Sequence, residues 1–130
     1  MNVDEFKAIK VKNKRGKPEE KLQEACVLWF YRQYPKRTIY SIPNGGSRDE
    51  REMVNLKKTG LLPGASDLVI PEAHHGYHCW FIEIKTPTGT QTPEQKEFEK
   101  QVTKVGNKYS IIRNVDQFIN EVTAYLNETR

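Results

Sequence analysis

The stretch CWFIEIK, residues 79–85, is the clearest strand signal in this 130-residue chain. Side chains alternate between the two faces of a strand, so the tryptophan and both isoleucines of the stretch share one apolar face. Glu83 and Lys85 leave from the opposite face. Burying two charged groups is costly unless they are paired or liganded. The stretch therefore predicts either an edge strand that carries an ion pair or a strand that carries a functional site.

Asp67 favours the functional site. It lies 16 residues before Glu83, at the start of a short apolar run that ends at Pro71. A hairpin between the two runs would bring Asp67 beside Glu83, and two converging carboxylates repel each other unless a cation lies between them. Hard oxygen ligands suit magnesium or manganese. A lysine beside such a site can orient or help to deprotonate an attacking water and stabilise charge on a phosphate.

The remaining sequence predicts helices and strands on both sides of this hairpin. A first helix is expected from Pro18 to about Tyr34, because proline suits the first turn and Pro35 ends the apolar pattern. A later helix should begin at Thr92 with a capping box formed with Gln95. Strands are expected at 38–42, 67–71, 79–85 and 108–113, with further helices at 48–59 and 115–127. This order predicts one mixed α/β domain built on a single sheet.

Composition limits the organisation and the partners. The length suits one domain, and residues 1–17, rich in lysine, are expected to form a flexible basic tail before a domain at 18–130. That tail is either solvated or an arm that lies along phosphates. The net charge of +4 weakly favours a polyanionic partner. No signal peptide or membrane span is expected, and Cys26 and Cys79 read as core residues, so a cytoplasmic location is expected.

These residues carry a resemblance to a known family. Asp67 followed by Glu83-Ile84-Lys85 resembles the catalytic motif of the PD-(D/E)XK nuclease superfamily. The segments PNGGSR (43–48), GLLPGASD (60–67) and FIEIK (81–85), with Gln95 in the next helix, resemble the VRR-NUC (virus-type replication-repair nuclease) pattern over about residues 18–113. The resemblance implies a restriction-endonuclease-like core, a mixed central sheet flanked by helices. Ser66 departs from the proline that is usual in this family.

The resemblance also implies a set of site residues. Asp67 and Glu83 would hold Mg²⁺, for which Mn²⁺ would substitute, together with the backbone carbonyl of Ile84. Lys85 would be the catalytic lysine. A glutamate on the first helix completes the family's site, and the spacing favours Glu20, with Glu24 one turn along as the reserve. Gln95 matches a family glutamine, although its capping-box position explains it equally well.

A glycine-rich loop is a candidate DNA-binding element. Paired glycines let the backbone approach a ligand, and the flanking polar side chains supply donors for phosphate. The alternative is an ordinary tight turn before a capped helix. The residues of this loop are Asn44, Gly45, Gly46, Ser47 and Arg48.

Three histidines lie close together in the sequence, at His74, His75 and His78. Zinc sites usually need four ligands, and both cysteines read as core. We therefore interpret the three histidines as residues of a polar loop.

The resemblance implies a metal-dependent DNA endonuclease that hydrolyses phosphodiester bonds with activated water and no covalent intermediate. The substrate would be structured DNA, such as Holliday junctions or flaps, and the active form a homodimer. Two alternatives remain open. One is a non-catalytic nucleic-acid-binding module with the same fold, although a degenerate relative would be expected to lose Asp67, Glu83 or Lys85. The other is a restriction-type nuclease that acts on linear duplex DNA.

Overall fold

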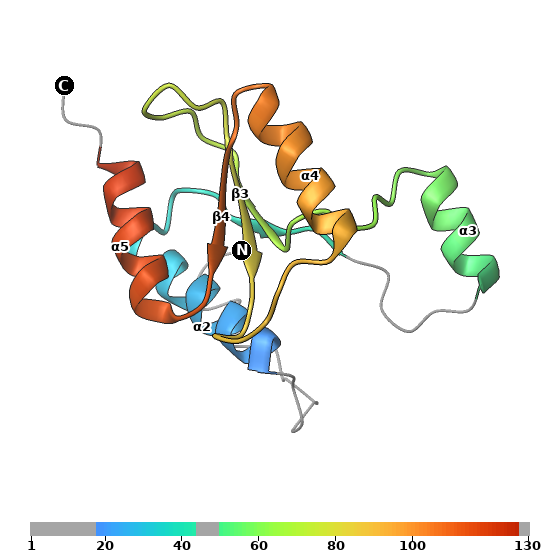
Figure 1. The fold of residues 1–130 in the computed structure, drawn as a ribbon. Coiled ribbons are helices and arrows are strands. Elements are labelled where there is room, and N and C mark those ends of the chain that lie inside the picture. Colours follow the sequence, from blue (N-terminus) through green and yellow to red (C-terminus); the bar gives the residue numbers. More distant parts are fainter. Residues whose placement is uncertain (1–17, 44–49, 128–130) are drawn as a thin grey trace.

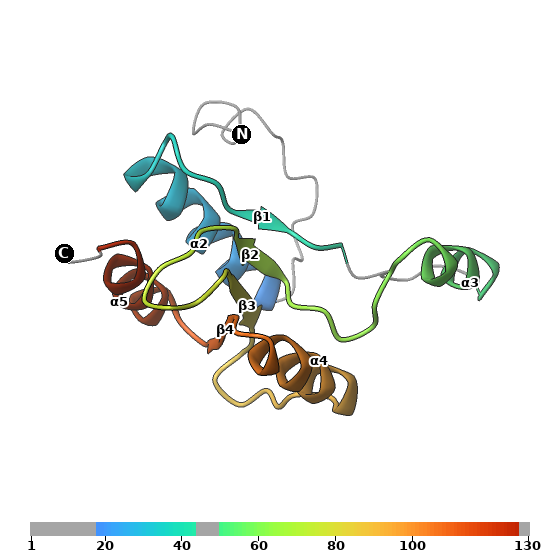
Figure 2. The ribbon, with the colours of Figure 1, turned by 90° about the horizontal axis from the view of Figure 1, so that it is seen from above.

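The fold is built on a mixed β-sheet. The computed structural model describes residues 18–43 and 50–127, and in these residues four strands form one sheet in the order β1-β2-β3-β4 (Figures 1 and 2). Strands β1 (Tyr40–Ser41), β2 (Leu68–Ile70) and β3 (Trp80–Ile84) are antiparallel neighbours. Strand β4 (Lys108–Ile112) runs parallel to β3. The expected strand order along the chain is confirmed.

Helices cover both faces of the sheet. Helices α2 (Pro18–Gln33) and α5 (Val115–Leu126) contact each other and lie on one face, whereas α4 (Pro93–Lys104) packs against β4 on the other (Figures 1 and 2). Helix α3 (Glu50–Lys58) follows β1. The order of helices and strands agrees with the sequence prediction, and the predicted ends differ by at most two residues. No helix in the described residues has the length and apolar character to cross a membrane.

The hydrophobic core lies between the sheet and the α2–α5 pair. The apolar face of β3 is buried there, and Phe30 of α2 and Phe118 of α5 belong to the same core. Cys26 is fully buried in this core, and burial raises the pKa of its thiol to about 12. Cys79 is half-buried at the start of β3. The β3 residues that face this core are Trp80, Ile82 and Ile84.

The opposite face of β3 lies under α4. The rings of Phe81 and Phe98 stack edge-to-face with their centroids 5.3 Å apart, and the rings of Phe98 and Tyr109 are 6.2 Å apart. Because residues two apart share a face, Glu83 leaves β3 on this same side. Strand β3 has a partner on each side, so the edge-strand interpretation of its charged residues is wrong.

Helix α3 stands apart from the rest of the domain. It packs against none of the other described helices or strands and projects away from the sheet (Figures 1 and 2). As the sequence predicts, Gly60 follows its end with a φ of +114°. The Leu61 amide donates to the Leu56 carbonyl at 2.8 Å, which closes the helix with a Schellman-type bond. The expected N-terminal cap of this helix, Ser47, lies outside the described residues.

Candidate active site

Asp67 is held against the end of β3 by a backbone hydrogen bond. Its Oδ2 accepts the Ile84 amide at 2.7 Å, and its own carbonyl accepts the Ile42 amide at 2.9 Å. The register pairs Leu68 with Ile82, so the next residues out along the two strands are Asp67 and Glu83. The hairpin expected from the sequence is therefore present.

Glu83 is buried beside this aspartate, with 2% of its surface exposed. Its Oε1 accepts a hydrogen bond from Gln95 at 2.8 Å, whereas its Oε2 is buried and accepts none from the described residues. Burial and the neighbouring Asp67 carboxylate together raise the pKa of Glu83 to about 9, and the Lys85 charge opposes this rise. Without a cation, Glu83 is therefore protonated at neutral pH.

Asp67 responds to the same surroundings. Burial raises its pKa, the Ile84 amide lowers it, and its contact with Glu83 also lowers it. Lys85, only 8% exposed, brings a positive charge that lowers the pKa of both acids. The structure thus brings together three of the predicted site residues, two carboxylates and one ammonium, in a largely buried setting.

Gln95 caps helix α4 and also contacts the buried acid. Its side-chain oxygen accepts the Thr92 amide at 2.9 Å and its own amide donates to Thr92 Oγ1 at 3.2 Å, which together form the capping box of α4. Its side-chain nitrogen points the other way and donates to Glu83. One glutamine therefore couples the start of α4 to the buried acid.

A close approach at Gly64 fixes the position of α4 relative to the site. A Cβ at Gly64 would lie 2.4 Å from the Glu94 carbonyl group and 2.8 Å from the Gln95 nitrogen. Gly64 also has a φ of +87°. Only glycine accepts both the backbone conformation and the contact. The loop that leads to Asp67 therefore lies directly against the first turn of α4.

The first helix brings a glutamate toward the site that differs from the expected one. The negative charge of Glu19 raises the pKa of both Asp67 and Glu83. Glu20, the expected residue, has an exposed side chain, as does Glu24, whereas Glu19 is half-buried. The helical pattern predicts which residues share a face of α2. It does not predict which of two adjacent glutamates lies nearer to the acids at the end of the sheet.

Two further polar residues near the site were not identified from the sequence. The Gln91 side chain donates to the Tyr109 hydroxyl at 3.3 Å and to Glu99 at 3.0 Å. Burial raises the pKa of Tyr109, and the charges of Glu83, Glu99 and Asp67 add to this rise while the Gln91 hydrogen bond opposes it. The available signal was the alternation of β4, which places Tyr109 on the α4 side of the sheet.

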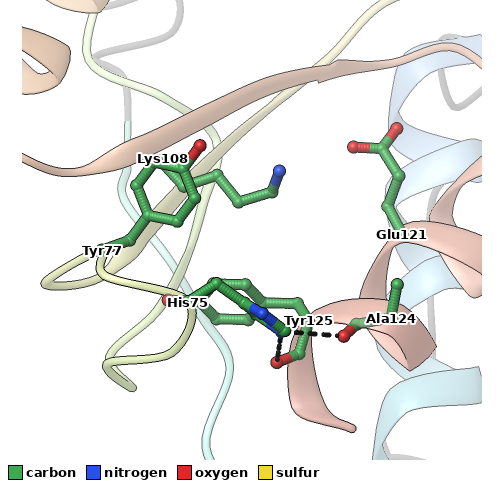
Figure 3. A pocket seen from close by; sticks show the side chains of 6 residues that line it. All are labelled: His75, Tyr77, Lys108, Glu121, Ala124 and Tyr125. Carbon is green, nitrogen blue, oxygen red and sulfur yellow. Dashed lines mark hydrogen bonds between the residues drawn. The ribbon is translucent and has the colours of Figure 1, made fainter. Parts of the chain in front are cut away.

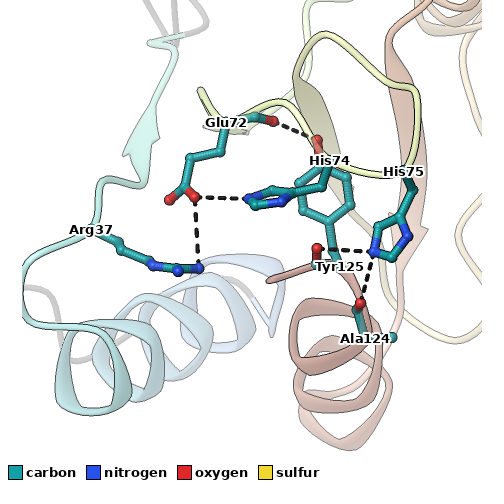
Figure 4. Close-up of polar contacts among 6 residues, drawn as sticks. All are labelled: Arg37, Glu72, His74, His75, Ala124 and Tyr125. Carbon is teal, nitrogen blue, oxygen red and sulfur yellow. Dashed lines mark hydrogen bonds and ion pairs between the residues drawn. The ribbon is translucent and has the colours of Figure 1, made fainter. Parts of the chain in front are cut away.

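The three histidines lie in or beside the β2–β3 connection. His74 bonds to Glu72 at 2.9 Å, and Arg37 lies 3.6 Å from the same carboxylate (Figure 4). His75 contacts the carbonyls of Ala124 and Tyr125 at the end of α5. These contacts explain His74 and His75 as structural residues of this connection.

A pocket lies beside the same connection. Its lining combines aromatic and charged side chains from the connection, the start of β4 and the end of α5 (Figure 3). The pairing of Trp80 with Lys108 places it at the end of β3 opposite Glu83. The lining residues are His75, Tyr77, Lys108, Glu121, Ala124 and Tyr125.

The glycine-rich loop cannot be placed relative to the site. Its predicted DNA-binding residues, Asn44, Gly45, Gly46, Ser47 and Arg48, lie outside the described residues, as does the basic tail 1–17. Their predicted roles stay predictions.

The donor set is compatible with a divalent cation. Within residues 18–43 and 50–127, no group of three or more His, Cys, Asp or Glu side chains gathers around one point. Two carboxylates converge, however, and one of them has a buried oxygen that accepts no hydrogen bond within the described part of the chain. Magnesium commonly binds proteins through one or two carboxylates and keeps several waters. The arrangement of Asp67 and Glu83 fits that pattern.

Comparison with known proteins identifies a structural relative. The fold is similar to a solved structure described as a "VRR_NUC domain protein", with a TM-score of 0.70 and 25% sequence identity, over 86% of this chain and 90% of the other. No protein-family model and no curated protein matches the sequence. The match supports a VRR-NUC domain, which is a nuclease-family domain, and with the mixed sheet and its helices it fits a restriction-endonuclease-like fold. The fold class predicted from the sequence is confirmed.

Proposed function

We propose that this chain, a VRR-NUC domain by its fold, is a Mg²⁺-dependent endodeoxyribonuclease. The observation that carries the proposal is the pair of touching carboxylates, one of them buried with a raised pKa, next to a nearly buried lysine. A protein that only bound nucleic acid would gain nothing from this arrangement, because two buried acids without a cation destabilise the fold.

Asp67 and Glu83 would hold the metal ion, joined by the backbone carbonyl of Ile84. The Ile84 amide points toward Asp67, and the carbonyl of a strand residue leaves on the same side as its amide. Mn²⁺ offers similar oxygen chemistry and should substitute. When bound, the ion would supply a Lewis acid for the phosphate oxygens and lower the pKa of a bound water.

The chain's own residues supply position and charge. The Ile84 amide fixes Asp67, and Gln95 fixes Glu83, so neither carboxylate needs to reorganise during the reaction. Lys85 places an ammonium group beside both acids, where it stabilises negative charge that develops on the phosphate. These restraints come from β3 and from the first turn of α4, which are rigid elements.

The first-helix acid of the site is proposed to be Glu19 in place of Glu20. The support for this proposal is the effect of the Glu19 charge on the pKa of both acids, together with the greater burial of Glu19 than of Glu20. Glu19 would act from the periphery of the site, through its charge or through a water molecule bound to the metal.

Structured DNA, such as a junction or flap, is proposed as the substrate, and a homodimer as the acting form. Helix α3 supports the dimer, because nine residues form a marginal helix in water unless another surface packs against them. Val54 on this helix is 50% exposed. The first turn is acidic, with Glu50 and Glu52, and the last turn is basic, with Lys57 and Lys58. Two copies of α3 packed antiparallel would therefore match opposite charges at both ends.

A cleavage panel tests the catalytic proposal. Holliday junction, flap, single-stranded and linear duplex DNA would be incubated with the purified protein and Mg²⁺. Cleavage of branched DNA that is lost in Asp67→Asn and Glu83→Gln is expected, while Ca²⁺-supported DNA binding remains. The matched control is Glu97→Gln, an exposed glutamate on α4 outside the site. Cleavage retained in either site variant would refute the assignment, and a preference for plain duplex would favour the restriction-type alternative.

A further inference from the structure

The segment that follows Lys85 forms a tight turn. The Gly89 amide donates to the Thr86 carbonyl at 3.2 Å, which closes the four residues 86–89 into a β-turn. Pro87 occupies the second position and Gly89 the fourth, the positions that these residues favour in such turns. The chain then reaches the N-cap of α4. This turn thus connects the strand that carries Glu83 and Lys85 to the helix that carries Gln95.

The turn lies against the aliphatic stem of Lys85. A Cβ built at Gly89 would be 3.5 Å from Cδ of Lys85 and 3.0 Å from Oγ1 of Thr86. These distances place Gly89 close to the lysine stem, with room between them for little more than a methyl group. The turn therefore helps to explain why Lys85 is only 8% exposed although it stands just beyond the end of β3.

Arg113 holds this turn from the neighbouring strand. Its guanidinium nitrogen donates to the carbonyls of Thr86 and Gly89, both at 2.7 Å, and lies 3.5 Å from the Pro87 carbonyl. Hydrogen bonds from an ionised donor are stronger than neutral ones. Three carbonyls of one turn are thus gathered on a single cation.

Arg113 is itself fixed in place. The Lys85 amide donates to the Ile112 carbonyl at 2.9 Å, so Arg113 is the first residue of the chain after the pairing of β3 with β4 ends. The Arg113 amide donates to the side chain of Gln117 at 2.8 Å, which ties it to the first turn of α5. The clamp therefore has a rigid base at the junction of β4 and α5.

We propose that Arg113 is a positioning residue that keeps the Lys85 ammonium at the carboxylate pair by clamping the Thr86–Gly89 turn over its stem. This role rests on the nuclease function proposed above. Without the guanidinium, the three carbonyls would turn toward water, the turn would open, and Lys85 would gain rotamer freedom. A catalytic group displaced by about 1 Å can lower a rate by about 100-fold.

The test compares Arg113→Gln and Arg113→Lys with Arg37→Gln as the matched control. The Arg37 guanidinium is also held by other residues of the chain, the Glu72 carboxylate at 3.6 Å and the ring of Tyr34, but in a different part of the domain. The first readout needs no activity. Metal-free protein is treated with an amine-acylating reagent, and the acylation of Lys85 is mapped by mass spectrometry relative to exposed Lys100. Arg113→Gln should raise the acylation of Lys85 several-fold, Arg113→Lys less, and Arg37→Gln not at all.

The second readout is single-turnover cleavage at saturating DNA, in the wild-type and Lys85→Ala backgrounds. Arg113→Gln should slow cleavage by about 10- to 100-fold with unchanged Ca²⁺-supported DNA affinity. The effect should vanish in the Lys85→Ala background, because a residue that acts through Lys85 is not additive with its loss. Additive losses, or unchanged acylation of Lys85 in Arg113→Gln, would overturn the clamp. If the wild-type protein cuts no DNA, the nuclease proposal fails, and the acylation result still decides whether Arg113 protects Lys85.

Discussion

At the scale of single residues, several groups of the site both stabilise the fold locally and position a neighbouring site residue. Gln95 caps its own helix and also restrains the buried carboxylate of Glu83. The Ile84 amide would be available for a sheet partner, but donates to Asp67. Gln95 and Glu83 were predicted from the sequence because each also follows a local rule. That rule is the capping box for Gln95 and strand alternation for Glu83.

The raised pKa of Glu83 predicts how the metal-free protein responds to pH. In the folded protein this group titrates at about 9, against an ordinary value of 4.5. Between those values the folded state binds more protons than the unfolded state, so the free energy of unfolding falls as pH rises. Thermal melts in EDTA should show Tm declining from about pH 5 to about pH 9, and Glu83→Gln should flatten this decline and raise Tm at the alkaline end. A decline of equal slope in the variant would contradict the prediction.

The same titration predicts the pH dependence of metal binding. A cation binds the ionised carboxylates, so binding must release the proton that Glu83 carries. Mg²⁺ affinity, measured by the rise in Tm with added metal, should therefore increase with pH over the range in which the metal-free protein loses stability. A constant affinity over that range would indicate that the cation binds elsewhere.

The first-helix acid separates what sequence reasoning can predict at this scale from what it cannot. Two adjacent glutamates have the same side-chain chemistry and the same helix propensity, so the sequence does not distinguish them. In the helix, however, their side chains point about 100° apart. Glu19→Gln should lower the cleavage rate strongly and Glu20→Gln mildly, measured in single-turnover assays at fixed Mg²⁺. Equal and mild effects would remove the first helix from the site. A stronger effect at Glu20 would restore the original sequence prediction.

At the scale of elements, the arrangement depends on contacts that hold the first turn of α4 in place. The sequence predicted α4 well, because its cap, proline and amphipathic pattern are local signals. The contact between Gly64 and the backbone of Glu94 and Gln95 was not predictable, because it joins segments about 30 residues apart in the sequence. Strand β1 was predicted too long for a related reason: its length depends on how far β2 remains beside it.

Gly64→Ala should show how much the site depends on this contact. The new methyl group would meet the α4 backbone and force α4 or the loop to move, which costs about 1–3 kcal/mol in the free energy of unfolding. Gly60→Ala is the matched control, since Gly60 also has a positive φ but its Cβ would meet nothing within 4 Å. Urea titrations should give a larger loss for Gly64→Ala. Cleavage should fall only in that variant, and equal losses in both would mean that backbone strain alone is responsible.

At the scale of the whole molecule, the sheet separates a structural side from a chemical side. One face meets α2 and α5 in a continuous apolar core, and the other meets α4 and carries the acids. Alternation along β3 predicted this division, because each of its residues had one clear side. The exposure of α3 was not predictable, since its amphipathic pattern equally suits a helix that packs on the domain.

The proposed dimer predicts a specific change of mass. Wild-type protein should sediment at twice the 15.1 kDa of one chain, and Val54→Asp should sediment as a monomer. The control Val105→Asp changes a valine that is 63% exposed at the end of α4 and should leave the dimer intact. A monomeric wild-type protein would contradict the dimer.

Charge reversal adds a test of the antiparallel arrangement. A variant with Glu50→Lys and Glu52→Lys, and another with Lys57→Glu and Lys58→Glu, should each be monomeric because like charges would meet at both ends. Mixed together, the two should form a heterodimer. A dimer that persists in either variant alone would place the interface elsewhere.

The single backbone bond between Ile42 and Asp67 has a consequence for how this domain can vary between lineages. That bond holds together the two ends of the segment that contains α3. This segment is therefore an insertion at one point of the sheet, between β1 and β2. Inserted segments of this kind tolerate replacement, provided that the stretch from Gly64 onward is kept for its contact with α4. Evolution, or a protein engineer, could graft a different module at this point while the Asp67 and Glu83 pair passes unchanged from one descendant to the next.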